Sequence, residues 1–446
     1  MTGRVRAVLW LASAIGALLL ALAAVDLQGD HPLLLPLAFL LVALTLASVA
    51  LAPVRAALAV AVRWLRARPL LYWLSILLIF IIGVSYWLVN WQPTNGRPLT
   101  AVEGAYLFGL LWLLFYLFFY DIDTAQVRAM GARLSSSRLS GVMVTLTTIT
   151  VLFFLAEAYL RIFYITTDGY GFTAMNYHWY RNFYWGQYNS AGYRDYEPQP
   201  DIPGLTRIAI VGDSFAMGHG INDIDDTFPQ LLQQALGDGY DVNLIAQSGW
   251  DTDIQLFMIQ SYPYRPDVVV LSYYLNDIDY LLEDAGLHPD SRFSFPENPL
   301  LSWFILNYFV PNYLYYNLLQ FTSVDRTSNH LLDLVNAHLD ERFWPAHAQH
   351  LFEIIDWAQR NEVRLILLLW PHITALEASQ PALEQVGGLF REHNVPVVDM
   401  TAPLAANPGP GLIVNRFDTH PGLDAQRLAA QALYEALAYE VLAAES

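Results

Sequence analysis

The sequence predicts a protein of two parts: a bundle of about five transmembrane helices, followed by an α/β domain in which helices cover both faces of a parallel sheet. The first observation is a hydrophobic content of 55% over 446 residues, which exceeds that of ordinary soluble domains and is concentrated in long apolar stretches before residue 165. The second is that short runs of Val, Ile and Leu alternate with helical periods after residue 204. Such runs are typical of parallel strands that are buried on both faces in a three-layer α/β/α arrangement.

The N-terminal part is interpreted as a membrane anchor. Helices of the required length, enough to cross roughly 30 Å of hydrocarbon, are expected at 4–26, 31–52, 69–91, 99–121 and 139–161. Arginines occupy alternate connections between these spans, at Arg4, Arg6, Arg55, Arg63, Arg66, Arg68, Arg128, Arg133 and Arg138. Because positive charge marks the cytoplasmic side, we expect a multi-pass protein of the cell membrane with a cytoplasmic N-terminus and an extracytoplasmic chain after residue 165. An ion pair between Glu157 and Arg161, four residues apart on the fifth helix, is also expected.

Charge and cysteine content limit the possible partners. Residues 1–165 contain 11 arginines and 6 acidic residues, whereas residues 166–446 contain 12 arginines and 35 acidic residues. A domain with this excess of negative charge repels phosphate backbones, which argues against nucleic acid and makes an anionic bilayer surface a poor partner. The chain has no cysteine, which excludes disulfides, thiolate metal sites and a cysteine nucleophile.

The C-terminal part divides into three regions. Residues 166–203 form a connector rich in aromatic side chains, which could lie at the level of the lipid headgroups or pack on the domain that follows. Residues 204–446 form the α/β domain, in which the alternation breaks at about 280–345. Aromatic residues crowd this insertion, and interruptions such as Pro311 make it too polar for a sixth span, so we interpret it as a lid or a membrane-facing flap.

The pattern also fixes the expected order of elements in the domain. Strands are expected near 207–213, 242–247, 267–274, 364–370 and 395–399, and helices near 227–236, 251–260, 346–361, 380–393 and 424–443. In an open parallel sheet, ligands bind beyond the carboxyl ends of the strands. Residues that follow the strands are therefore the first candidates for a functional site.

Polar groups suited to acyl transfer follow the first three strands. Ser214 lies in the sequence Gly-Asp-Ser at 212–214, where a nucleophile is expected. The next two strands end in Gln-Ser-Gly-Trp at 247–250 and Tyr-Leu-Asn-Asp at 274–277, and the N–H of Gly249 and the amide of Asn276 could stabilise an oxyanion. Near the C-terminus, His420 could accept the serine proton while Asp418 orients its imidazole.

These segments closely resemble the four consensus blocks of the SGNH hydrolases, also called the GDSL family of lipases and acylhydrolases. The resemblance covers residues 187–443 and includes Asn-Ser-Ala-Gly-Tyr-Arg at 189–194, a stretch that often precedes the first block in bacterial membrane-linked members. It implies a flavodoxin-like three-layer fold with Ser214 as nucleophile. Ser214 would also donate its N–H to the oxyanion hole, which Gly249 and Asn276 complete, and Asp418 and His420 would finish the triad.

One spacing departs from the family pattern. Many members separate the acid from the histidine by two residues, whereas Thr419 alone separates Asp418 from His420, and Phe417 occupies the usual acid position. The Asp-x-His spacing is similar to that of the polysaccharide O-acetyltransferase and acetylesterase branch. A dyad in which the backbone supports His420 therefore stays open as an alternative to the triad.

Other histidines and acidic residues are further candidates for a catalytic or metal-binding role. His372, after the fourth strand, is the rival base, and His219 is interpreted as a loop residue that shapes the cleft. The acidic residues Asp223, Asp225 and Asp226 are interpreted as a solvated loop that caps the following helix rather than a calcium site. Without a Gly-x-Gly-x-x-Gly or Walker motif after a strand, no nucleotide cofactor and no metal are expected.

Three functions are compatible with these residues. The preferred one is hydrolysis of an O-acyl ester, in particular O-acetyl, on an envelope glycan or lipid through an acyl-Ser214 intermediate. The second is transfer of the acyl group to an extracytoplasmic polysaccharide, with envelope-polysaccharide machinery as a possible partner. The third is a non-catalytic membrane scaffold or glycan-binding protein, against which the presence of Ser214, Asn276 and His420 together argues.

Overall fold

The computed structural model describes residues 124–136, 140–169, 173–200, 202–287, 296–322 and 324–444, with scattered positions between 56 and 81. The chain divides into two compact units, Met1–Phe163 and Tyr164–Ser446.

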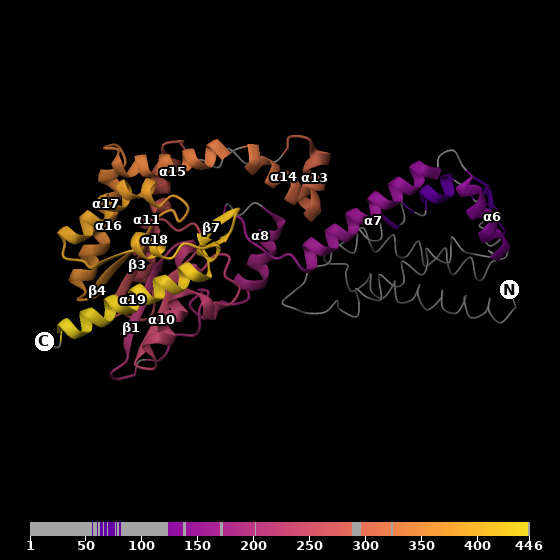
Figure 1. The fold of residues 1–446 in the computed structure, drawn as a ribbon. Helices are drawn as coiled ribbons and strands as arrows, with labels where there is room; N and C mark the ends of the chain where they lie inside the picture. Colours follow the sequence, from indigo (N-terminus) through magenta and orange to yellow (C-terminus); the bar gives the residue numbers. More distant parts are fainter. Residues whose placement is uncertain are drawn as a thin grey trace. The chain divides into compact units, whose positions relative to one another are not determined.

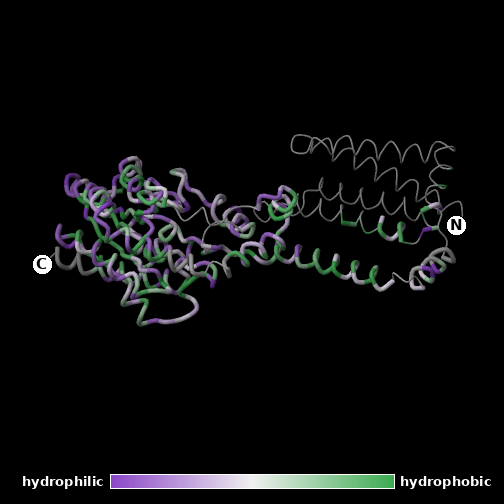
Figure 2. The backbone as a smooth tube through the Cα atoms, turned by 90° about the horizontal axis from the view of Figure 1, so that it is seen from above, coloured by the Kyte–Doolittle hydropathy of each residue, from purple (hydrophilic) through white to green (hydrophobic). Residues whose placement is uncertain are grey.

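The described part of the first unit is helical. Helix α6 spans Thr124–Ser135 and α7 spans Ser140–Ile162. Among the described residues, one helix is long and apolar enough to cross a membrane, Ser140–Arg161 with a mean hydropathy of 1.8, and Figure 2 shows it mostly in the colour of hydrophobic residues. The fifth predicted span is therefore a helix of suitable length. The first, second and fourth predicted spans and most of the third lie outside the described residues.

The polar pair on α7 forms as expected. Arg161 Nε lies 2.7 Å from Glu157 Oε1, and both side chains are buried. A buried charge is tolerated when it is paired, so this ion pair lets the two residues lie on an otherwise apolar helix.

The second unit is built on a five-stranded parallel sheet. The strands are β1 Thr206–Gly212, β2 Tyr240–Ala246, β3 Val268–Tyr274, β4 Arg364–Trp370 and β5 Val397–Asp399, and their order in the sheet is β2-β1-β3-β4-β5. All five strands match the predicted positions within a few residues. Because the chain moves from β1 to one side and then to the other, the carboxyl end of β1 is the point where a crevice opens.

Helices cover both faces of the sheet (Figure 1). Alternate residues of β1 belong to different cores: Ile208 and Ile210 face one core, and Ala209 and Val211 face the other. This alternation follows from the two-residue period of a strand and confirms the predicted three-layer arrangement. One core includes α10 Phe228–Leu236, α18 Thr401–Ala406 and α19 Leu423–Ala444; the other includes α11 Thr252–Ser261, α15 Val324–Leu339, α16 Trp344–Arg360 and α17 Leu376–Glu392.

The aromatic connector packs on the α/β domain. It forms α8, Ala174–Trp179, and a π-helical turn, Tyr180–Tyr184, and Trp179 and Tyr184 are buried in the same core as α10 and α19. Of the two arrangements that the sequence allowed, packing on the domain holds for these rings. Arg194 is also buried and donates to backbone carbonyls of Phe183, Met217, Gly218, Ile221 and Asn222.

Two further features complete the second unit. In the insertion between β3 and β4, the described residues before α15 include the helices α12 Asp279–Asp284, α13 Pro299–Asn307 and α14 Phe309–Thr322. An antiparallel hairpin of β6 Ile413–Asn415 and β7 Asp418–Pro421 precedes α19. The sequence patterns predicted the insertion and did not reveal the hairpin, whose strands are too short to show a period.

Candidate active site

Ser214 lies directly beyond the carboxyl end of β1. It is the first residue of the short helix α9, Ser214–Met217, and the Asp213 carboxylate caps this helix by accepting a hydrogen bond of 2.8 Å from the backbone N–H of Phe215. Gly212, the last residue of β1, permits a close approach to β3, because a Cβ atom at this position would lie 2.7 Å from the carbonyl oxygen of Ser272. The Gly-Asp-Ser sequence is thus a strand-to-helix turn that presents the serine to the crevice.

His420 and Asp418 reach Ser214 from the β6–β7 hairpin. His420 Nε2 lies 2.8 Å from Ser214 Oγ, and His420 Nδ1 lies 2.5 Å from Asp418 Oδ1. Side chains two residues apart lie on the same face of a strand, so β7 places the acid beside the histidine with Thr419 on the opposite face. The strand therefore explains the Asp-x-His spacing, and the structure brings together the three residues predicted as a triad.

The second oxygen of Asp418 has its own partners. The hydroxyl of Thr167 donates a hydrogen bond to Asp418 Oδ2, and His219 Nε2 lies 3.5 Å from the same oxygen. Burial alone would raise the pKa of Asp418, but the charges of His420 and His219 and the hydrogen bonds from His420 and Thr167 lower it well below the ordinary value. Asp418 is therefore a carboxylate and accepts at both oxygens, so Nδ1 of His420 carries the proton and Nε2 is free to accept one from Ser214.

The charge of Asp418 also sets the proton affinity of the base. Burial alone would lower the pKa of His420, but the charge of Asp418 and the hydrogen bond to it outweigh burial, and the pKa is raised above 6.5. A base with a raised pKa binds the serine proton more strongly once transfer begins.

His219 is a neutral side chain that contacts both the connector and Asp418. Its ring lies 4.3 Å from the ring of His420, and burial, together with the charge of His420, lowers the pKa of His219 to about 4. Nε2 faces acceptors, the carbonyl oxygen of Asp168 at 3.3 Å and the Asp418 carboxylate, so it carries the single ring proton. Nδ1 then accepts from the hydroxyl of Tyr180 at 3.2 Å, which keeps its proton because burial raises the pKa of Tyr180 to about 12.

The predicted oxyanion donors lie on the two strands that flank β1. Gly249 follows β2 in a left-handed turn with φ of +77° and no atom within 4 Å of where a Cβ would stand. Asn276 lies in the turn Leu275–Ile278 after β3, where its side chain lowers the pKa of Asp213 against the effect of burial. The strand order β2-β1-β3 therefore places one candidate donor on each side of Ser214.

Two carboxyl groups are buried behind Asn276. Burial raises the pKa of Asp213, and burial with the charges of Asp213 and Asp251 raises that of Asp277 well above the ordinary value. Gln255 Nε2 donates to Asp277 Oδ1 at 3.0 Å.

The rival histidine and the acidic loop have other roles. His372 Nδ1 pairs with Thr374 Oγ1 at 3.1 Å, and its backbone N–H donates to Ser379, whereas the imidazole that contacts Ser214 Oγ is that of His420. Asp223 caps the short 3-10 helix Ile224–Asp226 by accepting from the N–H of Asp225. The cap is thus on the turn before α10 and not on α10 itself, whose N-cap Thr227 makes no side-chain capping bond.

One group of side chains in the described part of the chain could ligate a metal. Ligand atoms of His219, Asp418 and His420 lie within 4.8 Å of one another. Binding of a metal to His420 or Asp418 would break hydrogen bonds that the ring nitrogens and the carboxylate oxygens make in this structure. The expectation of a metal-free site stays a prediction.

Sequence reasoning missed Thr167, Asp168 and Tyr180, which all come from the connector. The backbone of this segment also joins the hairpin, since Gly169 N–H donates to the carbonyl of Phe417 at 3.1 Å and Asn415 Nδ2 donates to that of Thr167 at 3.0 Å. Thr167 and Asp418 are separated by 251 positions in the chain, so no local motif could indicate the contact.

No family model and no curated protein matches the sequence. Among solved structures, the chain is similar to a member of the lipolytic protein G-D-S-L family from Veillonella parvula, with 15% identity over 52% of this chain and 97% of that one and a TM-score of 0.32. It is also similar to a psychrotrophic esterase from Pseudoalteromonas sp., with 13% identity over 53% of this chain and 98% of that one and a TM-score of 0.33. A third similar structure is a carbohydrate acetylesterase family member from Sinorhizobium meliloti, with 13% identity over 52% of this chain and 97% of that one and a TM-score of 0.29. Identities this low do not carry an activity from one protein to another, so the function must be argued from the site.

Replacing Asp418 with asparagine should separate the electrostatic role of the acid from its size. In the wild type, kcat/KM for an ester should fall as the pH drops through the raised pKa of His420, because protonated His420 cannot act as a base. In Asp418→Asn we expect a rate loss of roughly 10⁴-fold and an acid limb at lower pH, because the pKa of His420 falls without the carboxylate. A pH profile that keeps its wild-type midpoint in the variant would show that Asp418 does not set the pKa of the base.

Thr167 should act as a positioning residue through its hydroxyl. A hydrogen bond to a charged group contributes about 1.5–3 kcal/mol, so Thr167→Val should lower kcat by about tenfold or more with little change in KM, whereas Thr167→Ser should restore it. Steady-state kinetics of both variants check this. Equal activity of the valine and serine variants would mean that the contact to Asp418 has no catalytic consequence.

Asn276→Ala should reduce kcat by roughly 10²–10³-fold, the usual effect of removing one oxyanion donor, with a small change in KM. Asn407→Ala is the matched control, because the Asn407 side chain is exposed and donates to the carbonyl of Pro403. Wild-type kcat in Asn276→Ala would remove this residue from the oxyanion hole.

Proposed function

We propose that this protein is a membrane-anchored serine esterase of the SGNH type, which hydrolyses O-acyl esters through an acyl-Ser214 intermediate. The observation that carries the proposal is the contact of Ser214 Oγ with His420 Nε2 at 2.8 Å, with Asp418 2.5 Å behind the imidazole. A serine becomes a nucleophile when a positioned base accepts its proton. A binding protein or scaffold has no need of this arrangement.

In the first half-reaction, Ser214 Oγ attacks the ester carbonyl while its proton moves to His420 Nε2. The carbonyl oxygen becomes an oxyanion, which would be stabilised by the backbone N–H groups of Ser214 and Gly249 and by the amide of Asn276. The positive charge that develops on His420 is balanced by Asp418. The C–O bond to the alcohol then breaks, and His420 returns the proton to the departing alkoxide, so that a neutral alcohol leaves and an acyl-Ser214 ester remains.

In the second half-reaction, water takes the place of the alcohol. The oxygen of the water attacks the acyl carbon while His420 accepts a proton from this water, and the same donors stabilise the oxyanion. The bond between the acyl carbon and Ser214 Oγ then breaks as His420 returns the proton to Ser214 Oγ. The products are the carboxylic acid and the original serine. The ring of Phe215 stacks on Tyr274 with 3.9 Å between centroids and lies 5.3 Å from the ring of His420, so the base has an apolar neighbour.

The proposed location is the outer face of the cell membrane. Helix α7 has the length and hydropathy of a membrane span, and the arginines in alternate connections favour a multi-pass anchor that leaves the α/β domain outside the cytoplasm. The strong negative charge after residue 165 favours uncharged esters. We therefore propose an O-acyl group, in particular O-acetyl, on an envelope glycan or lipid as the substrate.

Reaction with a fluorophosphonate probe tests the proposal directly. The purified, detergent-solubilised wild type should be labelled at Ser214, as located by mass, because the probe reacts with activated serines. Ser214→Ala and His420→Ala should lose the label, and Ser261→Ala, which removes an exposed serine of α11, should keep it. Release of acetate from acetylated esters by the wild type, and not by Ser214→Ala, then measures hydrolysis.

Circular dichroism of each variant shows whether it is folded. A folded wild-type protein that resists the probe, or one labelled at another serine, would overturn the assignment of Ser214.

A further inference from the structure

The insertion presents an exposed apolar surface on α13 and α14. The large side chains that face solvent include six with exposed fractions from 47% for Leu301 to 76% for Leu300: Leu300, Leu301, Trp303, Leu306, Leu314 and Leu318. Three of those on α13 recur at three-residue steps (300, 303 and 306) and the two on α14 at a four-residue step, which are the spacings of one helix face. We call α13 and α14 together the helical hairpin, and these six residues the hairpin surface.

The hairpin has separate inner and outer faces. Ile305, Tyr308, Asn312 and Tyr316 are buried, and Asn312 Oδ1 accepts a hydrogen bond of 2.8 Å from the backbone N–H of Ala174 at the start of α8. The outer face is therefore exposed on helices that are firmly packed on their inner side. Large exposed apolar patches of this kind mark interaction sites.

Charge distinguishes the hairpin from the rest of its domain. The sequences of α13 and α14 contain no Asp, Glu, Lys or Arg, although residues 166–446 contain 35 acidic residues. A strongly acidic domain is repelled from anionic lipid headgroups. An uncharged surface of Leu and Trp side chains is suited to transfer into a bilayer interface.

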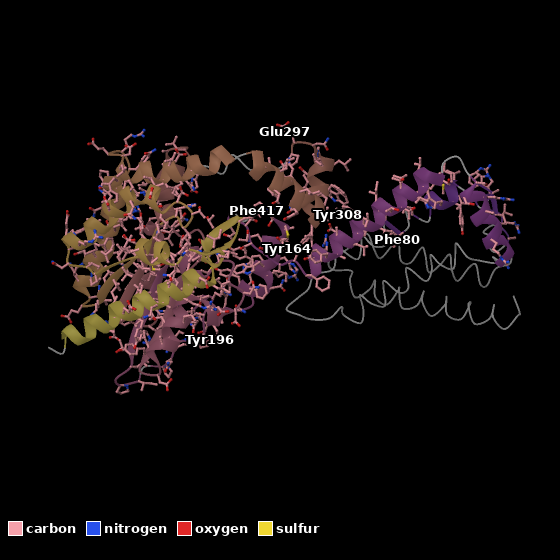
Figure 3. The ribbon with its side chains drawn as sticks, viewed as in Figure 1. Phe80, Tyr164, Tyr196, Glu297, Tyr308 and Phe417 are labelled. Atoms are coloured by element: carbon pink, nitrogen blue, oxygen red, sulfur yellow. The ribbon has the colours of Figure 1, made fainter. Side chains whose placement is uncertain are left out.

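The hairpin is also tied to the point where the domain begins. Tyr164, the first residue of the second unit, packs edge-to-face on Tyr313 of α14 with 6.1 Å between ring centroids; Tyr164 and Tyr308, which joins α13 to α14, are labelled in Figure 3. A single residue, Phe163, separates Tyr164 from the end of α7 at Ile162. A chain that leaves the bilayer at the end of α7 can therefore move only a short distance away before it reaches the residue that holds α14.

We propose that the hairpin surface docks on the lipid bilayer, with its apolar side chains in the interface between headgroups and acyl chains. This inference rests on the proposed membrane anchoring, and it adds a second, peripheral contact to the transmembrane one. The partner is a lipid surface with uncharged headgroups at the contact, since neither helix offers a cation to an anionic lipid.

A chain of hydrogen bonds connects the helical hairpin to the candidate active site. Asn312 binds the backbone of α8 at Ala174, and Asp168 accepts from both the N–H and the hydroxyl of Thr173 at the N-terminus of this helix. The carbonyl of Asp168 in turn accepts from His219, which packs on His420. The bilayer contact would thus hold the crevice near the membrane surface, where esters of membrane-bound glycans and lipids are found.

The absence of native cysteine permits a site-specific test in the full chain. Leu306→Cys and Leu318→Cys on the hairpin surface are compared with Phe257→Cys on α11, where the native side chain is exposed to a similar extent, 65%. Each variant is labelled with an environment-sensitive fluorophore and reconstituted in phosphatidylcholine vesicles. Quenching is measured with nitroxide-labelled lipids in both leaflets and, separately, with aqueous iodide.

We expect nitroxide lipids to cause a loss of fluorescence at positions 306 and 318, with a blue shift of the emission and weak quenching by iodide. At position 257 we expect strong quenching by iodide, little quenching by nitroxide lipids and no blue shift. Quenching by iodide at all three positions would overturn the proposal, because the hairpin surface would then face water. Protection of 306 and 318 from both quenchers would also overturn it, because protein and not lipid would cover the surface.

Separate measurements distinguish this inference from the proposed function. Flotation of the protein with the vesicles reports anchoring, and a protein that does not float would refute both the anchor and the docking. Circular dichroism shows whether the cysteine variants fold. A protein with lipid quenching at 306 and 318 that does not react with the fluorophosphonate would keep the docking surface and lose the esterase assignment.

Discussion

Asp418 carries a negative charge at a position that water does not reach, and taking a carboxylate out of water is costly unless partners compensate for the lost solvation. Three groups do so: the imidazole of His420, the hydroxyl of Thr167 and the Nε2 proton of His219. Each comes from a different segment of the chain. The charge is therefore stable only when the β6–β7 hairpin, the connector and the loop after Ser214 are all in place. The assembly of the site thus depends on this interaction.

The sheet order supplies the other half of the site. Because β1 lies between β2 and β3, the turns after these strands flank Ser214 even though Gly249 and Asn276 are distant in sequence. A different order of the same strands would separate the donors from the nucleophile. The hydrogen-bonded register of β1 with both neighbours fixes the three strand ends at one edge, so the candidate oxyanion donors are positioned by the same contacts that hold the sheet together.

The parts that sequence could predict are those with a period or a local motif. The five strands are continuous apolar runs such as Val268–Leu271, and they were placed within a few residues because burial on both faces leaves a strong pattern. Ser214, Gly249 and Asn276 can be predicted as candidate site residues because each follows such a run. The β6–β7 hairpin is too short for a pattern, and Thr167 reaches Asp418 across 251 positions, so its role depends on tertiary packing that composition does not encode.

The two adjacent histidines show how packing assigns roles that sequence left open. The rings of His219 and His420 lie 4.3 Å apart, and two imidazolium ions at that distance would repel each other strongly in a buried site. Asp418 makes its short contact with His420, at 2.5 Å, and its longer one with His219, at 3.5 Å. Burial lowers the pKa of both histidines, but the charge of Asp418 and the hydrogen bond to it raise that of His420 overall, whereas burial and the charge of His420 lower that of His219 to about 4. His420 is thus the candidate base for the serine proton, and His219 stays neutral and keeps its own proton directed at acceptors.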